Sequence, residues 1–191
     1  MTHPATIGAA QAEADTRRWL ERAVIGLNLC PFAKAVHVKG QIHYAVYEPA
    51  EEPDLMDALL AQAEELVALD AAVRDTTLLI APNALADFLD FNDFTARAER
   101  RLARDGFDGV LQLASFHPQF QFAGTEADDI GNATNRAPYP TLHLLREDSV
   151  SRAVEAFPEA EEIFERNIDR LEALGAEGWT ELDVGPGSAR P

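Results

Sequence analysis

The alternation of short apolar segments with longer amphipathic segments is the feature that most constrains the fold of this chain. Helical periodicity predicts helices at residues 9–29, 54–69, 83–104, 149–157 and 158–175. Short apolar runs predict strands at 76–82, 109–116 and 141–146, and one strand or a hairpin broken near Gly40 at 36–47. Strands that alternate with helices favour an α/β fold, with a sheet of about four strands and flanking helices. An α+β two-layer sandwich is the alternative, because the last strand follows a long loop instead of a helix.

The length of 191 residues fits a single domain. We expect a globular domain at residues 1–175 and a C-terminal tail at 176–191, where the segment GPGSARP should fray. No apolar run approaches the roughly 18 residues that a membrane helix requires, and no secretory leader is visible. A single cysteine fits a reducing compartment. We therefore expect a cytoplasmic protein.

The chain is strongly acidic, with a formal net charge of −17. Nucleic-acid binding requires clustered Lys and Arg, whereas here the basic residues are few and scattered, which argues against that class of partner. An anionic small molecule requires a local group of basic side chains. The composition fits a monomer and a dimer equally.

Residues 117–139 have little periodicity and form a loop longer than the roughly 15 residues that a compact domain usually allows. The loop contains several aromatic residues, which is too apolar for disorder. It begins at the carboxyl end of a predicted strand, where open α/β sheets bind their ligands. We expect it to border a ligand site.

A basic side chain in this loop has the chemistry of an anion site. Arg136 provides a planar fork of donors for a carboxylate or a phosphate, and Asn132 and Asn135 provide further donors. Alternatively, Arg136 pairs with Asp128 or Asp129 and only fastens the loop.

Two histidines are candidates for chemistry. His117 would act as a general base near neutral pH, oriented by Asp128 or Asp129. His143 lies inside a predicted strand, either as a hydrogen-bonded core residue or as a ligand contact. With the loop carboxylates the two histidines would ligate zinc or iron, although no HExxH motif is present.

The single thiol is a candidate nucleophile or redox group. Cys30 precedes Pro31 at the expected start of a helical turn, where the helix dipole and Lys34 would lower its pKa. The alternative is a small buried hydrophobic residue between Leu29 and Phe32. No dinucleotide fingerprint, P-loop or G-x-S-x-G elbow is present, and the cofactor is unknown.

Three segments resemble a known bacterial family: GLNLCPFA at 26–33, SFHPQFQFAG at 115–124 and DIGNATNRAPYPTLHLLRE at 129–147. The chain is similar over most of its length to the domain-of-unknown-function family 1415. Ala137 stands where the family pattern suggests serine, so a hydroxyl there is not required. The resemblance implies no activity. It places these residues in the family pattern: Cys30, His117, Asn132, Asn135, Arg136 and His143.

The leading hypothesis is a small enzyme that acts on an anionic metabolite in a pocket where a thiol, an imidazole and a guanidinium converge. The proposed catalytic residues are Cys30, His117 and Asp129. The proposed substrate-binding residues are Lys34, Asn132, Asn135, Arg136 and His143. A non-catalytic binding or regulatory module is the alternative, and metal chemistry through His117 and His143 is a minor variant.

Overall fold

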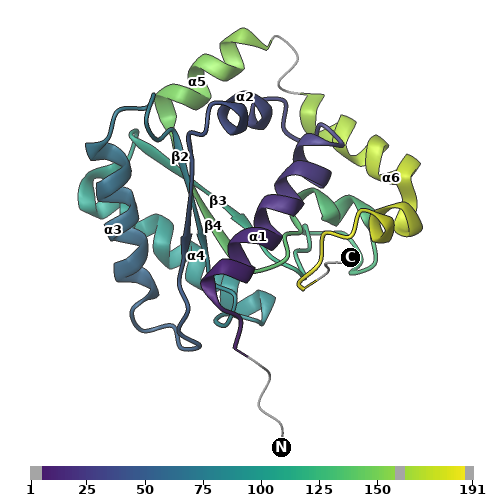
Figure 1. Ribbon diagram of the computed structural model, residues 1–191, viewed down its shortest axis with the longest axis horizontal. Coiled ribbons are helices and arrows are strands. Elements are labelled where there is room, and N and C mark those ends of the chain that lie inside the picture. Colours follow the sequence, from purple (N-terminus) through teal and green to yellow (C-terminus); the bar gives the residue numbers. More distant parts are fainter. Residues whose placement is uncertain (1–5, 158–161, 188–191) are drawn as a thin grey trace, which may run out of the picture.

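The computed structural model describes residues 6–157 and 162–187, which fold around one open sheet of four strands with the order β1-β2-β4-β3 (Figure 1). The strands are β1 (Ile42–Val46), β2 (Thr76–Ile80), β3 (Leu111–Phe116) and β4 (Thr141–Arg146). Strand β2 runs parallel to β1, and β4 runs antiparallel to both of its neighbours. The predicted α/β class with a four-stranded sheet is confirmed. Within the described ranges, no helix has the length and apolar character needed to cross a membrane.

Helices cover both faces of this sheet (Figure 1). The α-helices are α1 (Ala9–Trp19), α2 (Ala33–Val38), α3 (Leu55–Ala68), α4 (Phe88–Leu102), α5 (Glu147–Ala156) and α6 (Ile163–Glu181). Two π-helical turns, η1 (Leu20–Ile25) and η2 (Ala103–Phe107), extend α1 and α4, and η3 (Ile130–Asn135) is a 3-10 helix. Helices α3 and α4 pack on one face, and α1, η1 and α2 lie over the other.

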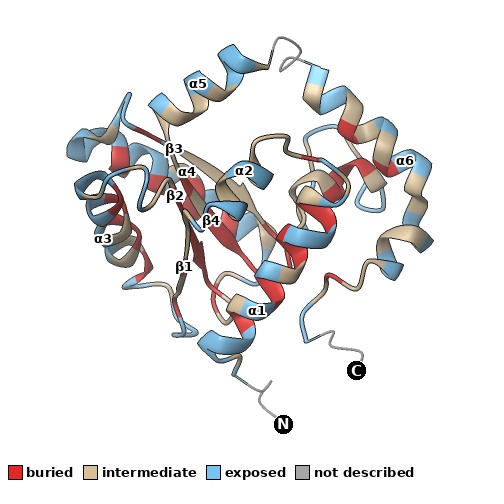
Figure 2. Ribbon diagram, turned by 45° about the horizontal axis from the view of Figure 1, so that its top comes forward, coloured by how far each residue is buried: buried red, intermediate tan, exposed pale blue. Residues whose placement is uncertain are grey.

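The central strand β2 shows why the sheet needs two helical layers. Leu79 packs in the core with α3 and α4, whereas Leu78 and Ile80 pack in the core with α1 and η1. All five residues of β2 are buried, as Figure 2 shows for the middle of the sheet. Successive side chains of a strand point to opposite faces, so a strand buried on both sides reads as a continuous apolar run.

Several element boundaries differ from the prediction, each for a local reason. Residues 36–38 belong to helix α2 and not to a strand, because Gly40, with φ of 68°, separates this short helix from β1. Helix α4 begins at Phe88, because the side chain of Asp87 caps its first turn. The side chain of Asn83 instead bonds the backbone of Ile7.

The C-terminal segment also differs from the prediction, which ended the domain at residue 175. Gly175 has φ of 69° and produces a kink, but α6 continues across it to Glu181. Val184 is buried, and the backbone N–H of Gly187 donates to the carboxylate of Asp15. Residues 176–187 are therefore packed against the domain, and residues 188–191 lie outside the described part of the chain.

A buried carboxylate joins three distant segments at this point. Asp15 is fully buried and accepts hydrogen bonds from the Tyr139 hydroxyl (2.6 Å), from Arg18 and from the backbone of Gly187. Burial raises the pKa of the Asp15 carboxyl, but these hydrogen bonds together outweigh burial and lower it. The ionised carboxylate of Asp15 therefore connects α1 to the Pro-Tyr-Pro segment at residues 138–140 and to the C-terminal segment.

Candidate functional site

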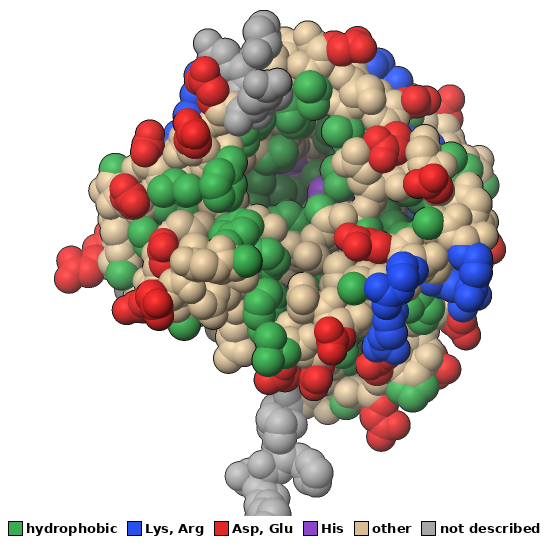
Figure 3. Space-filling model, turned by 180° about the vertical axis from the view of Figure 1, so that it is seen from behind, with side chains coloured by type: hydrophobic (Ala, Val, Ile, Leu, Met, Phe, Trp, Pro, Cys, Tyr) green, Lys and Arg blue, Asp and Glu red, His purple; other side chains and the backbone are tan. Residues whose placement is uncertain are grey.

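A cavity of about 300 Å³ lies between the sheet and the helical layer that contains α1, η1, α2 and α5. Figure 3 shows the hollow on one face of the molecule, with hydrophobic walls and histidine atoms inside. Most of the lining is apolar, and it includes Trp19, Leu20, Val24, Phe32, Leu78, Phe116, Leu145 and Val150. Few polar side chains reach it, and these are the groups that give the cavity its chemistry.

The floor of the cavity is one face of the sheet. His143 of β4 stands in register between Leu78 of β2 and Ala114 of β3. Thr76 lies two residues before Leu78 on β2, and Phe116 lies two residues after Ala114 on β3. Alternate residues of a strand share a face, so both side chains lie on the same face as His143 and line the cavity. Ile42 of β1, in register with Thr76, also lines the cavity, so all four strands contribute to one continuous floor.

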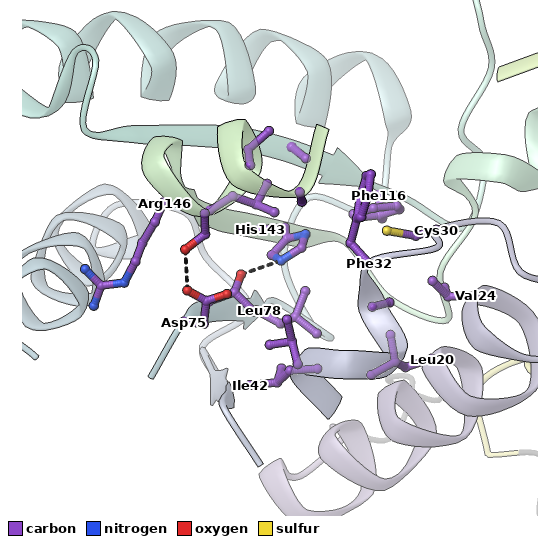
Figure 4. Close-up of a pocket in the computed structure, with 18 of the residues that line it drawn as sticks. Leu20, Val24, Cys30, Phe32, Ile42, Asp75, Leu78, Phe116, His143 and Arg146 are labelled. Atoms are coloured by element: carbon purple, nitrogen blue, oxygen red, sulfur yellow. Dashed lines mark hydrogen bonds between the residues drawn. The ribbon is translucent and has the colours of Figure 1, made fainter. Parts of the chain in front are cut away.

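The wall that carries Cys30 depends on the π-helical turn η1. The backbone N–H of Gly26 donates to the carbonyl of Glu21, five residues earlier, at 3.0 Å. A Cβ at Gly26 would lie 2.2 Å from the carbonyl oxygen of Arg22, so the tight approach requires glycine. The chain then turns at Pro31 and places Cys30 and the following aromatic ring at the cavity (Figure 4).

Helix α5 forms another wall, and it is loosely attached. Val150 and Ala153 line the cavity, yet none of the ten residues of α5, all of them described, is buried. Near its start, the Ser149 hydroxyl donates to the Asp75 carboxylate. Just beyond its end, the ring of Phe157 contacts Phe32 edge-on, at 6.0 Å between centroids. The helix thus spans one side of the cavity between these two contacts.

The central polar group of the cavity is the imidazole of His143. Its Nε2 lies 2.6 Å from the Thr76 hydroxyl oxygen, a contact drawn as the dashed line from the His143 ring in Figure 4. That hydroxyl also donates to the carbonyl of Leu144 at 2.6 Å. Burial lowers the pKa of His143 to about 4, so the ring is neutral at pH 7. A neutral imidazole presents one donor and one acceptor nitrogen.

Cys30 lines the same cavity, but its thiol is not activated. Burial raises the pKa of Cys30, and the backbone N–H groups of Phe32 and Ala33 offset this only in part. The prediction of a lowered thiol pKa is wrong, because the apolar surroundings outweigh the dipole of one short turn. Lys34 is exposed on α2 and is not among the residues that line the cavity.

His117, the predicted base, is fully buried outside the cavity. Its Nδ1 accepts from the backbone N–H of Gln119 at 3.0 Å, and its Nε2 donates to the carbonyl of Leu85 at 3.1 Å. The rings of Phe88 and Phe91 pack against the imidazole. Burial lowers the pKa of His117, and both ring nitrogens are engaged, one within the loop and one with the segment that precedes α4.

The two predicted asparagines also hold the loop together. The carbonyl oxygen of the Asn132 side chain accepts from the backbone N–H of Phe122 (3.0 Å) and from the Thr125 hydroxyl (2.9 Å). Asn132 is fully buried, and Asn135 donates to the carbonyl of Ser115 at 3.2 Å. These contacts close residues 115–135 into a compact unit.

Arg136 fastens the same loop, as the alternative interpretation proposed, but through backbone carbonyls instead of carboxylates. Its guanidinium donates to the carbonyls of Phe120 (3.2 Å) and Ala127 (2.6 Å). The exposed residue Asp129 caps η3 by accepting from the backbone N–H of Gly131 at 2.8 Å. Neither residue lines the cavity.

The structure therefore brings together two of the predicted site residues, Cys30 and His143, and separates them from His117 and Arg136. Sequence reasoning missed Thr76, whose only signal is a hydroxyl at the start of the apolar run TTLLI. Over residues 6–157 and 162–187, no three His, Cys, Asp or Glu side chains cluster in a way that would hold a metal ion.

A comparison with protein families identifies a family for this chain. A family model described as "Protein of unknown function (DUF1415)" matches residues 11–181, which confirms the resemblance drawn from the motifs. No curated protein and no solved structure matches the chain.

Proposed function

The chain belongs to the DUF1415 family, whose description assigns no activity, and we propose that it binds a small, largely apolar organic molecule in the cavity on the α1 side of the sheet. The observation that carries this proposal is the cavity itself, with its volume of about 300 Å³ and its apolar walls. Small-molecule sites are typically concave, mostly apolar and equipped with a few polar groups that orient the ligand. His143, Thr76 and Cys30 are such groups.

The shape of the cavity supports binding over a purely structural origin. Protein interiors pack closely and leave few voids larger than a water molecule. This hollow opens at the surface (Figure 3), so its apolar walls lack packing partners and are exposed to water, which is unfavourable for apolar surface. Val150 and Ala153 on α5 face this space without becoming buried. A ligand would supply the missing partners.

The charges around the cavity support an uncharged ligand more than the anion that we predicted from the sequence. Arg146 reaches the lining, but its guanidinium donates to the carbonyls of Leu66, Leu69 and Arg74 and points away from the space (Figure 4). The carboxylate of Asp75 lies at the lining and would repel an anion. Arg136, the predicted anion contact, lies elsewhere.

Binding without turnover is better supported than the enzyme that we predicted. Cys30 and His143 share the cavity, which is the observation in favour of catalysis. Burial raises the pKa of the Cys30 thiol, whereas a nucleophilic cysteine requires a lowered one. A general base is most effective when its pKa is close to the working pH, and the pKa of His143 lies well below neutrality.

Filling the cavity from α5 tests this proposal. Ala153→Trp places a large ring where the helix lines the cavity, and Ala156→Trp places the same ring at an exposed position of the same helix. We expect indole to bind the unmodified protein in isothermal titration calorimetry. Its affinity should fall at least about tenfold in Ala153→Trp, which corresponds to about 1.4 kcal/mol, and should be unchanged in Ala156→Trp. Absence of indole binding, or equal binding by both variants, would overturn the proposal.

A further inference from the structure

The hydrogen bonds of His143, a residue that lines the cavity, define which nitrogen of its ring remains free as an acceptor. The Thr76 hydroxyl has one proton, and the carbonyl of Leu144, 2.6 Å away, accepts it. The Thr76 oxygen must then accept from Nε2 of His143, also at 2.6 Å, so Nε2 carries the ring hydrogen. Nδ1 is left with a lone pair, and no described residue donates to it.

The surroundings of the ring preserve this arrangement. His143 lies on the floor of the cavity next to Leu78 and Ala114, and Phe116 packs near its ring at 6.1 Å between centroids. Burial by these apolar neighbours lowers the pKa of His143, so the ring is neutral at pH 7 and Nδ1 does not become a donor. An acceptor nitrogen in an apolar space is costly to desolvate unless a donor reaches it.

We propose that the cavity selects an uncharged molecule of about the size of two fused rings that donates an N–H or O–H hydrogen bond to Nδ1 of His143. This inference rests on the proposed function and names its ligand class. The size follows from the volume of about 300 Å³, because an apolar cavity of about 150 Å³ holds one benzene. The donor follows from the free lone pair.

Three bicyclic compounds of nearly equal size and shape separate this proposal from simple cavity filling. Indole has an N–H donor, benzofuran has an oxygen acceptor in its place, and indene has neither. We expect indole to bind at least about fivefold more tightly than benzofuran or indene, because one net hydrogen bond contributes about 1 kcal/mol. Calorimetric titration of the unmodified protein with each compound measures this ratio.

Two variants assign the preference to the imidazole. In His143→Phe the ratio of the indole affinity to the benzofuran affinity should fall to about one, because the acceptor is gone. In Phe116→Leu, which changes an apolar wall without a hydrogen bond, all three affinities should change together and the ratio should remain.

A spectroscopic measurement on the unmodified protein keeps the proposal testable even where a variant fails to fold. With 15N-labelled histidine, indole should shift the Nδ1 resonance of His143 upfield, in the direction of a hydrogen-bonded acceptor, and indene should not. Equal affinities for the three compounds, or an unshifted Nδ1, would overturn the donor proposal and leave the binding function intact. If none of the three compounds binds, the proposed function fails as well.

Discussion

His143 should make the stability of this protein depend on pH between neutrality and pH 4. In the unfolded chain a histidine has a pKa of about 6.5, whereas burial lowers the pKa of His143 to about 4 in the folded protein. Between these values the unfolded state binds a proton that the folded state does not, so stability is lost as the pH falls through this window. From pH 7 to pH 5, the linkage relation gives a loss of about 2 kcal/mol for this one group.

The difference between the unmodified protein and His143→Gln isolates this contribution. Glutamine retains a donor for Thr76 but does not titrate, so the substitution should remove the pH dependence of stability that arises at this position. Urea unfolding at pH 7 and pH 5 measures each free energy by linear extrapolation. We expect the free energy of unfolding of the unmodified protein, relative to that of His143→Gln, to decrease by about 2 kcal/mol from pH 7 to pH 5.

Leu145→Val provides the matched control, because Leu145 lines the same cavity from the same strand and carries no proton. Its effect on the free energy of unfolding should be the same at both pH values. If the effect of His143→Gln were also constant within about 0.5 kcal/mol, the imidazole would not be held neutral by burial, and the assignment of Nδ1 as an acceptor at pH 7 would lose its support.

Two further predictions concern the thiol and the loop. Because burial raises the pKa of Cys30, its alkylation by iodoacetamide at pH 7 should be slower than that of free cysteine, and its rate should rise over a higher range of pH. Rapid labelling below pH 7 would contradict this. Saturating indole should slow the labelling further, because Cys30 lines the same cavity, and labelling that indole does not slow would contradict binding there. Arg136→Ala should lower the free energy of unfolding by roughly 1–3 kcal/mol, because the carbonyls of Phe120 and Ala127 lose their donors, while Arg100→Ala at an exposed position of α4 changes it little. Neither variant should alter the affinity for indole, and a loss of indole binding in Arg136→Ala would instead connect the loop to the ligand.

The local pattern of the sequence predicted the sheet and most helices, because an element that buries one face has apolar residues at regular intervals. The run TTLLIAP predicts β2, and the structure has a strand at Thr76–Ile80. The short stretch VHV at 36–38 is ambiguous, since two valines on either side of a histidine fit a strand and a single helical turn equally well. Gly175 was read as a helix end, although a kinked helix that continues past a left-handed glycine has the same local signal.

The site could not be predicted in the same way, because its contacts join residues that are far apart in the chain. Thr76 and His143 are 67 positions apart and meet only through the register of β2 and β4. The polar residues of the long loop, Asn132 and Arg136, looked functional by their chemistry, but the sequence contained no sign that backbone carbonyls would engage them. A loop without regular structure must satisfy its own polar backbone, and these side chains do that.

The π-helical turn η1 has a consequence for how the cavity depends on the chain. A π-helical turn is closed by a hydrogen bond between residues five positions apart, whereas an α-helical turn is closed by one between residues four positions apart. Deleting one residue from Leu20–Ile25 would restore regular α-helical pitch and rotate the following segment by about 100° around the helix axis. Cys30 and Phe32 would then move away from the cavity, whereas the side chains of the sheet floor would stay in place. The position of this wall is thus set by the number of residues in one helix, so a single-residue deletion would change the shape of the cavity more than a substitution in its lining.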